Sequence, residues 1–173
     1  MDDSWMLPAE AIEYVVSHCL EKTKVLEFGS GHGSQLLANH VDLYSVEHDE
    51  SWIDITSSSY IFAPIQKNTF SEENGQSGWY DLEVVEKMWP KEIEFVVIDG
   101  PPGVIGRFGI LSILHRLESV SSILVDDVDR PDEHRLALRL ADELDMSLTI
   151  HDVDKPRKGG TERKFAVLLR RND

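Results

Sequence analysis

The chain has 173 residues, of which 41% are hydrophobic and 28% charged, and this size and mixture are typical of one globular domain. Its 32 acidic residues outnumber 17 Lys and Arg residues and give a net charge of −15, which disfavours nucleic acid and anionic membranes as partners. The acidic start, the lack of a long apolar run and the single cysteine, Cys19, predict a cytoplasmic protein without an internal disulfide. We therefore expect one domain over residues 1–173.

The first predicted element is a helix over residues 8–20, which opens with Pro8. Ile12, Val15 and Leu20 fall on one face of this helix at helical spacing. We expect residues 1–22 to pack with this apolar face against the core.

The central feature of the sequence is VLEFGSGHGSQLLA, residues 25–38. A buried strand over 25–28 is predicted to end in a turn with Gly29, Gly31 and Gly33, and a helix to begin at about Ser34. Glycines allow positive φ angles and a close approach of the backbone to a ligand, and the following helix start offers free N–H groups. This layout is typical of a nucleotide-type cofactor site in an open α/β sheet.

Two acidic residues decide which cofactor fits this turn. Glu27, two residues before Gly29, would repel a pyrophosphate and attract the ammonium group of an amino-acid cofactor. The pattern E-x-G-x-G-x-G resembles the first motif of class I S-adenosylmethionine (SAM) methyltransferases. Glu47 ends the predicted strand 43–47, about 20 residues after the turn, where a carboxylate accepts ribose hydroxyls. The predicted cofactor contacts here are Glu27, Gly29, Ser30, Gly31, His32, Gly33, Ser34, Glu47 and His48.

The next segments are a predicted short helix over 50–58, a third strand over 60–65 and a long polar loop over 66–78. A loop of this length is more typical of a working loop than of a simple connection. The class I resemblance implies that adenine lies at the end of the third strand, which makes Asn68, Thr69 and Phe70 candidates. An ordinary solvated loop is the alternative.

The second half of the chain alternates predicted helices and strands. Helices are expected over 82–88, 108–117 and from Pro131 onward, the last with Leu136, Leu138 and Leu140 buried. Strands are expected within 94–103, ending in Asp99, within 122–130, ending in Asp126 and Asp127, and over 147–152 and 164–170. The fold prediction is therefore an α/β protein with a Rossmann-like, seven-stranded class I methyltransferase sheet, mostly parallel with a C-terminal antiparallel hairpin.

Three aspartates follow two of these predicted strands: Asp99 after one, and Asp126 and Asp127 after the next. Ligands of open α/β sheets bind at such strand ends, and converging carboxylates need a cation, a shared proton or donor groups. A Mg²⁺-type ion is one answer, and the arrangement is similar to the catechol O-methyltransferase family. A general base for a hydroxyl proton and a structural partner for Arg130 are the alternatives.

Four segments together, GSGHGSQLLA, VEHDESWI, VVIDGPPGVIGRFG and ILVDDVDRPDEH, resemble the plant polysaccharide-biosynthesis family that includes glucuronoxylan 4-O-methyltransferase. The resemblance implies that Glu47 binds the ribose and that Asp99 and Arg107 face the substrate. It also implies that Asp127 and Arg130 complete the active edge. The segment 155–164 carries five cations, and it is either a solvated hairpin loop or a clamp for an anionic acceptor such as a uronate.

These observations predict a SAM-dependent O-methyltransferase whose acceptor is a hydroxyl of a small molecule or sugar. The predicted catalytic residues are Asp99, Asp126, Asp127, Arg107 and Arg130, with Asp99 and Gly100 also near SAM. A divalent cation held by the three aspartates is an open alternative. A non-catalytic SAM-binding or nucleotide-binding module is the alternative from another functional class.

Overall fold

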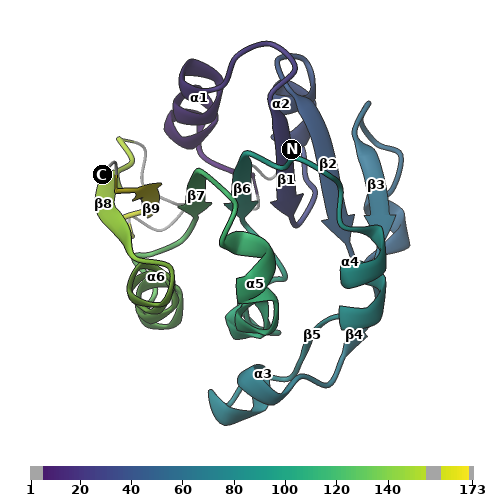
Figure 1. Cartoon of the computed structure of the whole chain (residues 1–173), viewed down its shortest axis with the longest axis vertical. Helices are drawn as coiled ribbons and strands as arrows, with labels where there is room; N and C mark the ends of the chain where they lie inside the picture. Colours follow the sequence, from purple (N-terminus) through teal and green to yellow (C-terminus); the bar gives the residue numbers. More distant parts are fainter. Residues whose placement is uncertain (1–5, 155–160, 172–173) are drawn as a thin grey trace.

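The computed structural model describes residues 6–154 and 161–171, and its centre is a seven-stranded sheet (Figure 1). The strand order is β3-β2-β1-β6-β7-β9-β8, and β9 runs antiparallel to both of its neighbours. This order and the C-terminal hairpin confirm the predicted fold class. The strands are β1 (Lys24–Phe28), β2 (Asp42–Glu47), β3 (Ser59–Phe62), β6 (Phe95–Ile98), β7 (Ser122–Val125), β8 (Met146–Asp152) and β9 (Lys164–Arg170).

Helices cover both faces of the sheet (Figure 1). α1 (Ala9–His18) and α2 (Ser34–Ala38) lie on one face, and α4 (Leu82–Met88), α5 (Leu114–Leu117) and α6 (Pro131–Glu143) lie on the other. The core accordingly forms two clusters of buried side chains, one on each side of the sheet. None of the helices in the described part of the chain combines the length and the apolarity needed to cross a bilayer.

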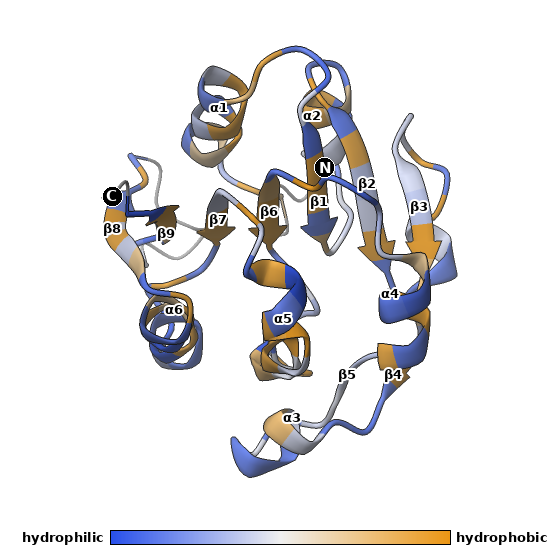
Figure 2. Ribbon diagram, in the orientation of Figure 1, coloured by the Kyte–Doolittle hydropathy of each residue, from blue (hydrophilic) through white to orange (hydrophobic). Residues whose placement is uncertain are grey.

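The central strands are apolar because both of their faces are covered. All four residues of β6, Phe-Val-Val-Ile, are buried, and Figure 2 shows hydrophobic colour on this strand. β1 lies between β2 and β6, so the chain leaves β1 toward one edge of the sheet and returns on its other side. Such a reversal opens a crevice at the carboxyl ends of the strands, and it places the glycine turn after β1 in that crevice.

The predicted helix over 50–58 is wrong beyond its first turn. Only a 3₁₀ helix, η2 (Glu50–Trp52), forms there. Asp54 has a positive φ of 59°, which no α-helix allows, and Ile55 is 41% exposed rather than packed in the core. The side chains of Asp49 and Thr56 accept backbone hydrogen bonds from Ser51 and Ser58, so local turns replace the helix.

The region after the third strand also differs from the prediction. β3 ends at Phe62, and Ile65–Gln66 forms β4, which pairs with β5 (Trp79–Tyr80) in a separate two-stranded sheet. Pro64 explains the break, because proline lacks an N–H group and restricts the residue before it. The expected loop contains α3 (Thr69–Glu73), which lies at the end of the molecule far from α1 and α2 (Figure 1).

Three details of the predicted helices need correction. α1 ends at His18, so Leu20 lies beyond it and is 82% exposed. The segment 108–117 begins as the 3₁₀ helix η3 (Phe108–Ile113) and becomes α-helical only at α5. Leu138 of α6 is 51% exposed, whereas Leu136 and Leu140 are buried, because it points away from the sheet.

Candidate functional site

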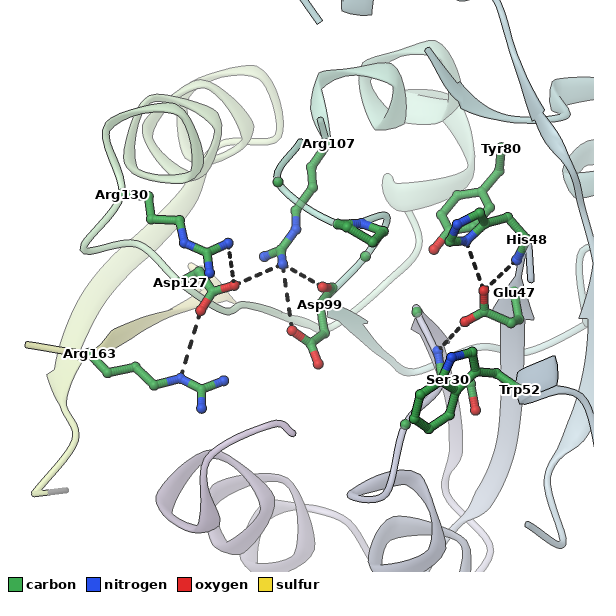
Figure 3. Close-up of a pocket in the computed structure, with 15 residues that line it drawn as sticks. Ser30, Glu47, His48, Trp52, Tyr80, Asp99, Arg107, Asp127, Arg130 and Arg163 are labelled. Atoms are coloured by element: carbon green, nitrogen blue, oxygen red, sulfur yellow. Dashed lines mark hydrogen bonds and ion pairs between the residues drawn. The ribbon is translucent and has the colours of Figure 1, made fainter. Parts of the chain in front are cut away.

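A cavity of about 280 Å³ lies at the carboxyl ends of the central strands (Figure 3). The turns after β1, β2, β6 and β7 supply most of its wall, as the sheet reversal predicts. The wall combines glycine backbone, aromatic rings and charged side chains. The lining residues are Gly29, Ser30, Gly31, Glu47, His48, Trp52, Tyr80, Asp99, Gly100, Pro102, Gly103, Arg107, Asp127, Arg130 and Arg163.

Two glycines allow the turns after β1 and β6 to touch. Gly29 has a φ of +90°, and a Cβ atom built on it would lie 2.8 Å from the backbone nitrogen of Gly100. A Cβ on Gly100 would lie 2.7 Å from the Cα of Gly29. Any side chain at either position would push the two turns apart, so both glycines keep the floor of the cavity closed.

Glu47 is held at the end of β2 by backbone donors. The N–H of Ser30 donates to Oε2 at 2.9 Å, and the N–H groups of His48 and Asp49 donate to Oε1 at 2.6 and 2.9 Å. Because these donors fix the carboxylate against the cavity wall, its remaining lone pairs can accept hydrogen bonds from a ligand. This geometry agrees with the predicted role of an acid at this position, which is to bind ribose hydroxyls.

Glu27 lies behind the cavity rather than on its wall. Its side chain is 3% exposed, and Oε1 accepts a hydrogen bond from the Ser45 hydroxyl at 2.5 Å. Burial raises the pKa of Glu27 from 4.5 to about 7, although hydrogen bonds from Ser34 and Ser45 act in the opposite direction. The charge of Glu47 adds to the increase. The carboxyl group of Glu27 is therefore partly protonated near neutral pH.

The other end of the cavity is a cluster of aspartates and arginines (Figure 3). Nη2 of Arg107 lies 2.9 Å from Oδ2 of Asp127 and 3.6 Å from Oδ1 of Asp99. The Arg107 guanidinium also donates to the backbone carbonyls of Pro101, Asp99 and Asp126. Arg107 therefore joins the turns after β6 and β7. Only 3% of its surface is exposed, and most of its N–H donors are already used, so few remain for a substrate.

Arg130 and Arg163 complete this cluster. Nη1 of Arg130 lies 3.0 Å from Oδ2 of Asp127, and its side chain is 37% exposed at the rim of the cavity. Nη2 of Arg163, which immediately precedes β9, lies 2.5 Å from Oδ2 of the buried Asp126. Glu133 of α6 is also buried, at 4.0 Å from Arg107 and 3.9 Å from Arg130. Four carboxylates and three guanidinium groups therefore share this end of the site.

Two acids of the cluster hold their protons more strongly than ordinary aspartates. Burial and the charge of Asp126 raise the pKa of Asp99 well above its ordinary value, against the opposing effect of Arg107. Burial and the charge of Asp127 likewise raise the pKa of Asp126, which Arg163 and Arg107 partly offset. Asp99 keeps 21% of its side chain exposed and lines the cavity, whereas Asp126 is fully buried. Of these two acids, Asp99 is thus the one that a ligand can reach.

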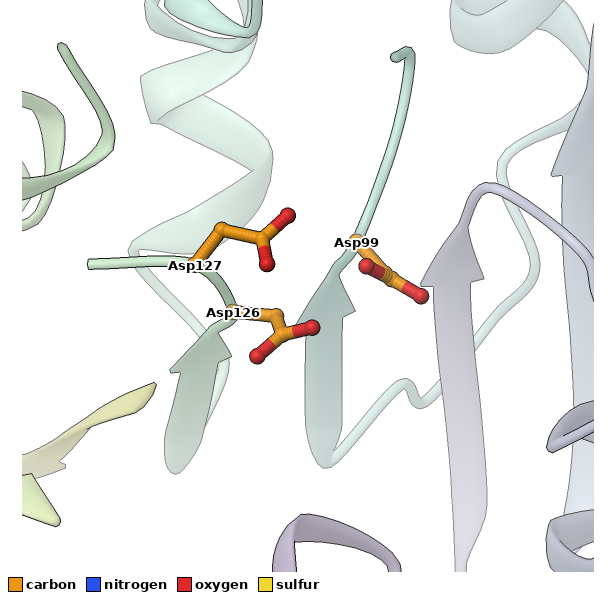
Figure 4. Close-up of side chains that lie close together, drawn as sticks. All are labelled: Asp99, Asp126 and Asp127. Carbon is orange, nitrogen blue, oxygen red and sulfur yellow. The ribbon is translucent and has the colours of Figure 1, made fainter. Parts of the chain in front are cut away.

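The three aspartates meet as predicted, but their surroundings do not fit a divalent cation (Figure 4). One oxygen from each of Asp99, Asp126 and Asp127 lies within 4.8 Å of the others. The guanidinium groups of Arg107, Arg130 and Arg163 already supply positive charge to these carboxylates. A Mg²⁺ ion would have to displace these ion pairs and approach three cations. The charge balance therefore favours the arginines over a metal ion as partners of these carboxylates.

Several predicted cofactor contacts lie away from the cavity wall. The ring of His32 packs edge-on against that of Trp52, with 5.3 Å between the ring centroids, and both rings line a second, neighbouring pocket. Gly33 faces α1, where a Cβ atom would meet Ile12 at 3.3 Å. Ser34 accepts a hydrogen bond from the N–H of Gly31 at 3.0 Å and so closes the turn. These residues shape the glycine turn from behind.

The predicted adenine contacts after the third strand lie elsewhere in the structure. Asn68 accepts a hydrogen bond from Ser71 N at 3.1 Å and donates one to Ser112 Oγ at 2.8 Å, so it caps α3 and joins it to η3. Thr69 and Phe70 belong to α3, and Phe70 packs against the core. None of these three residues lines the cavity. The predicted basic clamp at Lys155, Arg157 and Lys158 lies outside the described residues.

The sequence interpretation missed Tyr80, Glu133 and Arg163. Tyr80 follows the polar loop, and its motif, Trp-Tyr-Asp, carries no feature typical of a ligand site. Glu133 lies with Asp132 in the first turn of α6, where acidic residues are common, so its position in the sequence does not mark it as a site residue. Arg163 is one of many cations in a hairpin segment, and only the antiparallel pairing of β9 with β7 brings it to Asp126.

Known structures share this architecture at low sequence identity. The O-methyltransferase TomG from Streptomyces achromogenes, which is involved in tomaymycin synthesis and was solved with SAM, is 16% identical. The match covers 96% of this chain and 82% of that one, with a TM-score of 0.59. An O-methyltransferase from Bacillus cereus solved with S-adenosylhomocysteine (SAH) is 13% identical over 95% of this chain and 82% of its own, with a TM-score of 0.57. The chain has the class I methyltransferase fold.

Enzymes with different acceptors share this fold. A putative tRNA methyltransferase from Streptococcus pneumoniae, solved with SAM, is 13% identical, covers 96% of this chain and 75% of its own, and has a TM-score of 0.57. No family model and no curated protein matches the sequence. The expected membership of the plant glucuronoxylan methyltransferase family is therefore not supported.

Proposed function

We propose that this protein is a SAM-dependent methyltransferase that acts on a hydroxyl group of a small molecule or sugar. The observation that carries the proposal is one continuous cavity with two chemically different ends. The glycine turn and Glu47 form one end, and the partly exposed Asp99 stands at the other, among the arginines. Bound SAM would supply an electrophilic methyl group in this cavity.

In this proposal Glu47 binds the ribose hydroxyls, and the backbone of Gly29, Ser30 and Gly31 lies along the cofactor. Asp99 is the general base, because it lines the cavity and its raised pKa makes it a better proton acceptor than an ordinary carboxylate. With SAM bound, the acceptor hydroxyl would pass its proton to Asp99 while its oxygen bonds to the methyl carbon, and the bond between that carbon and the sulfonium sulfur would break, so that SAH leaves. Arg107 holds Asp99 and Asp127 in place, so it is a positioning residue.

The charge of the cluster bears on the kind of acceptor. Among the arginines of this cluster, Arg107 and Arg163 are buried in ion pairs with carboxylates, whereas Arg130 keeps a partly exposed guanidinium at the rim. Within the described part of the chain, an anionic acceptor group would therefore bind at Arg130. The net charge of −15 disfavours nucleic acid as the acceptor. We retain the cytoplasm as the expected location.

Calorimetric titration with SAM and SAH tests the cofactor assignment. We expect both ligands to bind the wild-type protein and binding to weaken at least 10-fold in Glu47→Gln, because the ribose loses an ionised acceptor. Glu50→Gln, a change of an exposed carboxylate three residues away, is the matched control. Failure of the wild-type protein to bind either ligand would contradict the proposal.

Methyl transfer is tested by SAH production with a panel of phenols, sugars and uronates. We expect turnover with at least one hydroxyl acceptor and a decrease in kcat of about 10²- to 10⁴-fold in Asp99→Asn, the range typical of losing a general base. SAH should still bind to this variant. Cofactor binding without turnover on any acceptor would favour the non-catalytic module instead.

A further inference from the structure

Tyr80 of β5 projects its side chain into the cavity from outside the main sheet. Figure 3 shows its hydroxyl pointing into the space between Asp99 and Glu47. The side chain is 1% exposed, and its ring lies 5.8 Å from that of Phe28 and 6.0 Å from that of His48. These contacts fix the ring, so the hydroxyl occupies a defined place in the cavity wall.

Packing accounts for the ring of Tyr80 but not for its oxygen. Within the part of the chain that the structure describes, the hydroxyl has no hydrogen-bond partner. A buried hydroxyl without a partner destabilises a folded protein, and phenylalanine would fill the same space without that cost. An unpaired polar atom in a binding cavity is accounted for when a ligand supplies the missing partner.

The position of the hydroxyl indicates which ligand this is. A Cβ atom on Gly100 would lie 2.5 Å from the Tyr80 oxygen and 2.7 Å from the Cα of Gly29. The hydroxyl therefore touches the place where the two glycine turns meet, on the side of the cavity that holds Glu47 and His48. Burial and the charge of Glu47 raise the pKa of Tyr80 well above 10, so the phenol stays protonated and can donate.

We propose that Tyr80 is a cofactor-binding residue whose hydroxyl donates a hydrogen bond to the nucleoside of SAM or SAH. This inference rests on the proposed methyltransferase function and adds a contact that the glycine turn and Glu47 do not provide. It also gives a reason for glycine at position 100: a side chain there would close the space between the Tyr80 hydroxyl and the turn after β1.

Tyr80→Phe tests the proposal, because it removes only the oxygen and leaves the ring packing intact. SAH is the probe, since it carries the nucleoside and has no reactive methyl group. We expect its Kd to rise about 3- to 10-fold, which corresponds to one neutral hydrogen bond. The melting temperature of the ligand-free variant should equal or exceed that of the wild type, because an unpaired buried hydroxyl is gone.

The matched control is Tyr14→Phe in α1, where the ring packs against His18 and Phe165 away from the cavity. SAH affinity should not change in this variant. An unchanged Kd in Tyr80→Phe would overturn the inference while leaving the methyltransferase proposal intact. A lower melting temperature of ligand-free Tyr80→Phe would also overturn it, because the hydroxyl would then stabilise the empty protein. Failure of the wild-type protein to bind SAH would reject both proposals.

Discussion

Glu27 provides a direct test of the electrostatics beneath the glycine turn. Its carboxyl group is 3% exposed in the centre of the sheet, and its pKa is raised from 4.5 to about 7, mainly by burial. Because the folded protein binds this proton more tightly than the unfolded chain, Glu27 favours folding below pH 4.5. That contribution is lost as the pH rises from 4.5 to about 7. Replacing Glu27 with Gln removes the titration and keeps the shape.

The expected magnitude follows from the two pKa values. Each pKa unit corresponds to about 1.4 kcal/mol, so the interval from 4.5 to about 7 corresponds to roughly 3 kcal/mol. The free energy of unfolding of the wild-type protein should therefore fall by about 3 kcal/mol relative to that of Glu27→Gln across this interval. Asp99, Asp126 and Glu133 also have raised pKa values, but they are present in both proteins and largely cancel in the difference.

Urea unfolding followed by circular dichroism at several pH values between 4 and 8 measures this difference. Glu13→Gln on α1 serves as the control, because that carboxylate is exposed and its replacement should leave the pH profile unchanged. If wild-type and Glu27→Gln stabilities run parallel over the whole range, the carboxyl group is ionised without a penalty. The argument from burial would then be wrong.

Three further predictions concern the cavity. Arg163→Met should lower the free energy of unfolding by up to about 3–5 kcal/mol, because the buried Asp126 loses its ion-pair partner and must either stay charged without it or take up a proton. Arg135→Met, which removes an exposed ion pair, is the control and should lower the free energy of unfolding by no more than about 1 kcal/mol. Urea titrations measure both variants, and equal decreases would contradict the argument from burial. Millimolar Mg²⁺ should leave the calorimetric Kd of SAH unchanged, and a Kd that falls with Mg²⁺ would restore the metal hypothesis. Gly100→Ala should abolish SAH binding and lower the melting temperature, because its Cβ would meet backbone at Gly29; normal affinity would refute the close packing of the two turns.

The fold was predictable because its signals are local. The apolar run without alternation gave the central strand β6, and the glycine pattern gave the end of β1 and the turn that leads to α2. The errors fall where side-chain hydrogen bonds in turns, or a proline, override such signals. Residues 53–58 have a helix-compatible sequence but form side-chain hydrogen bonds to serine N–H groups, and Pro64 divides one apolar stretch into β3 and β4.

The Glu47 end of the cavity was more predictable than the end with the aspartates and arginines. The sequence interpretation expected Glu47 at the end of β2, and the structure places its carboxylate on the cavity wall. Contacts expected of His32, Thr69 and Phe70 were inferred from their place in the chain alone, and their side chains lie away from that wall. Proximity in sequence to a motif is thus weaker evidence than the position of a residue at a strand end.

Arg163 shows why the end with the aspartates and arginines could not be predicted from the sequence. It follows a strongly charged segment and looks like one more solvated cation, yet it is 8% exposed. The antiparallel insertion of β9 between β7 and β8 carries it from the end of the chain to the aspartates that follow β7. Three aspartates without these arginines would call for a metal ion. The same aspartates paired with Arg107, Arg130 and Arg163 have their charge balanced without one.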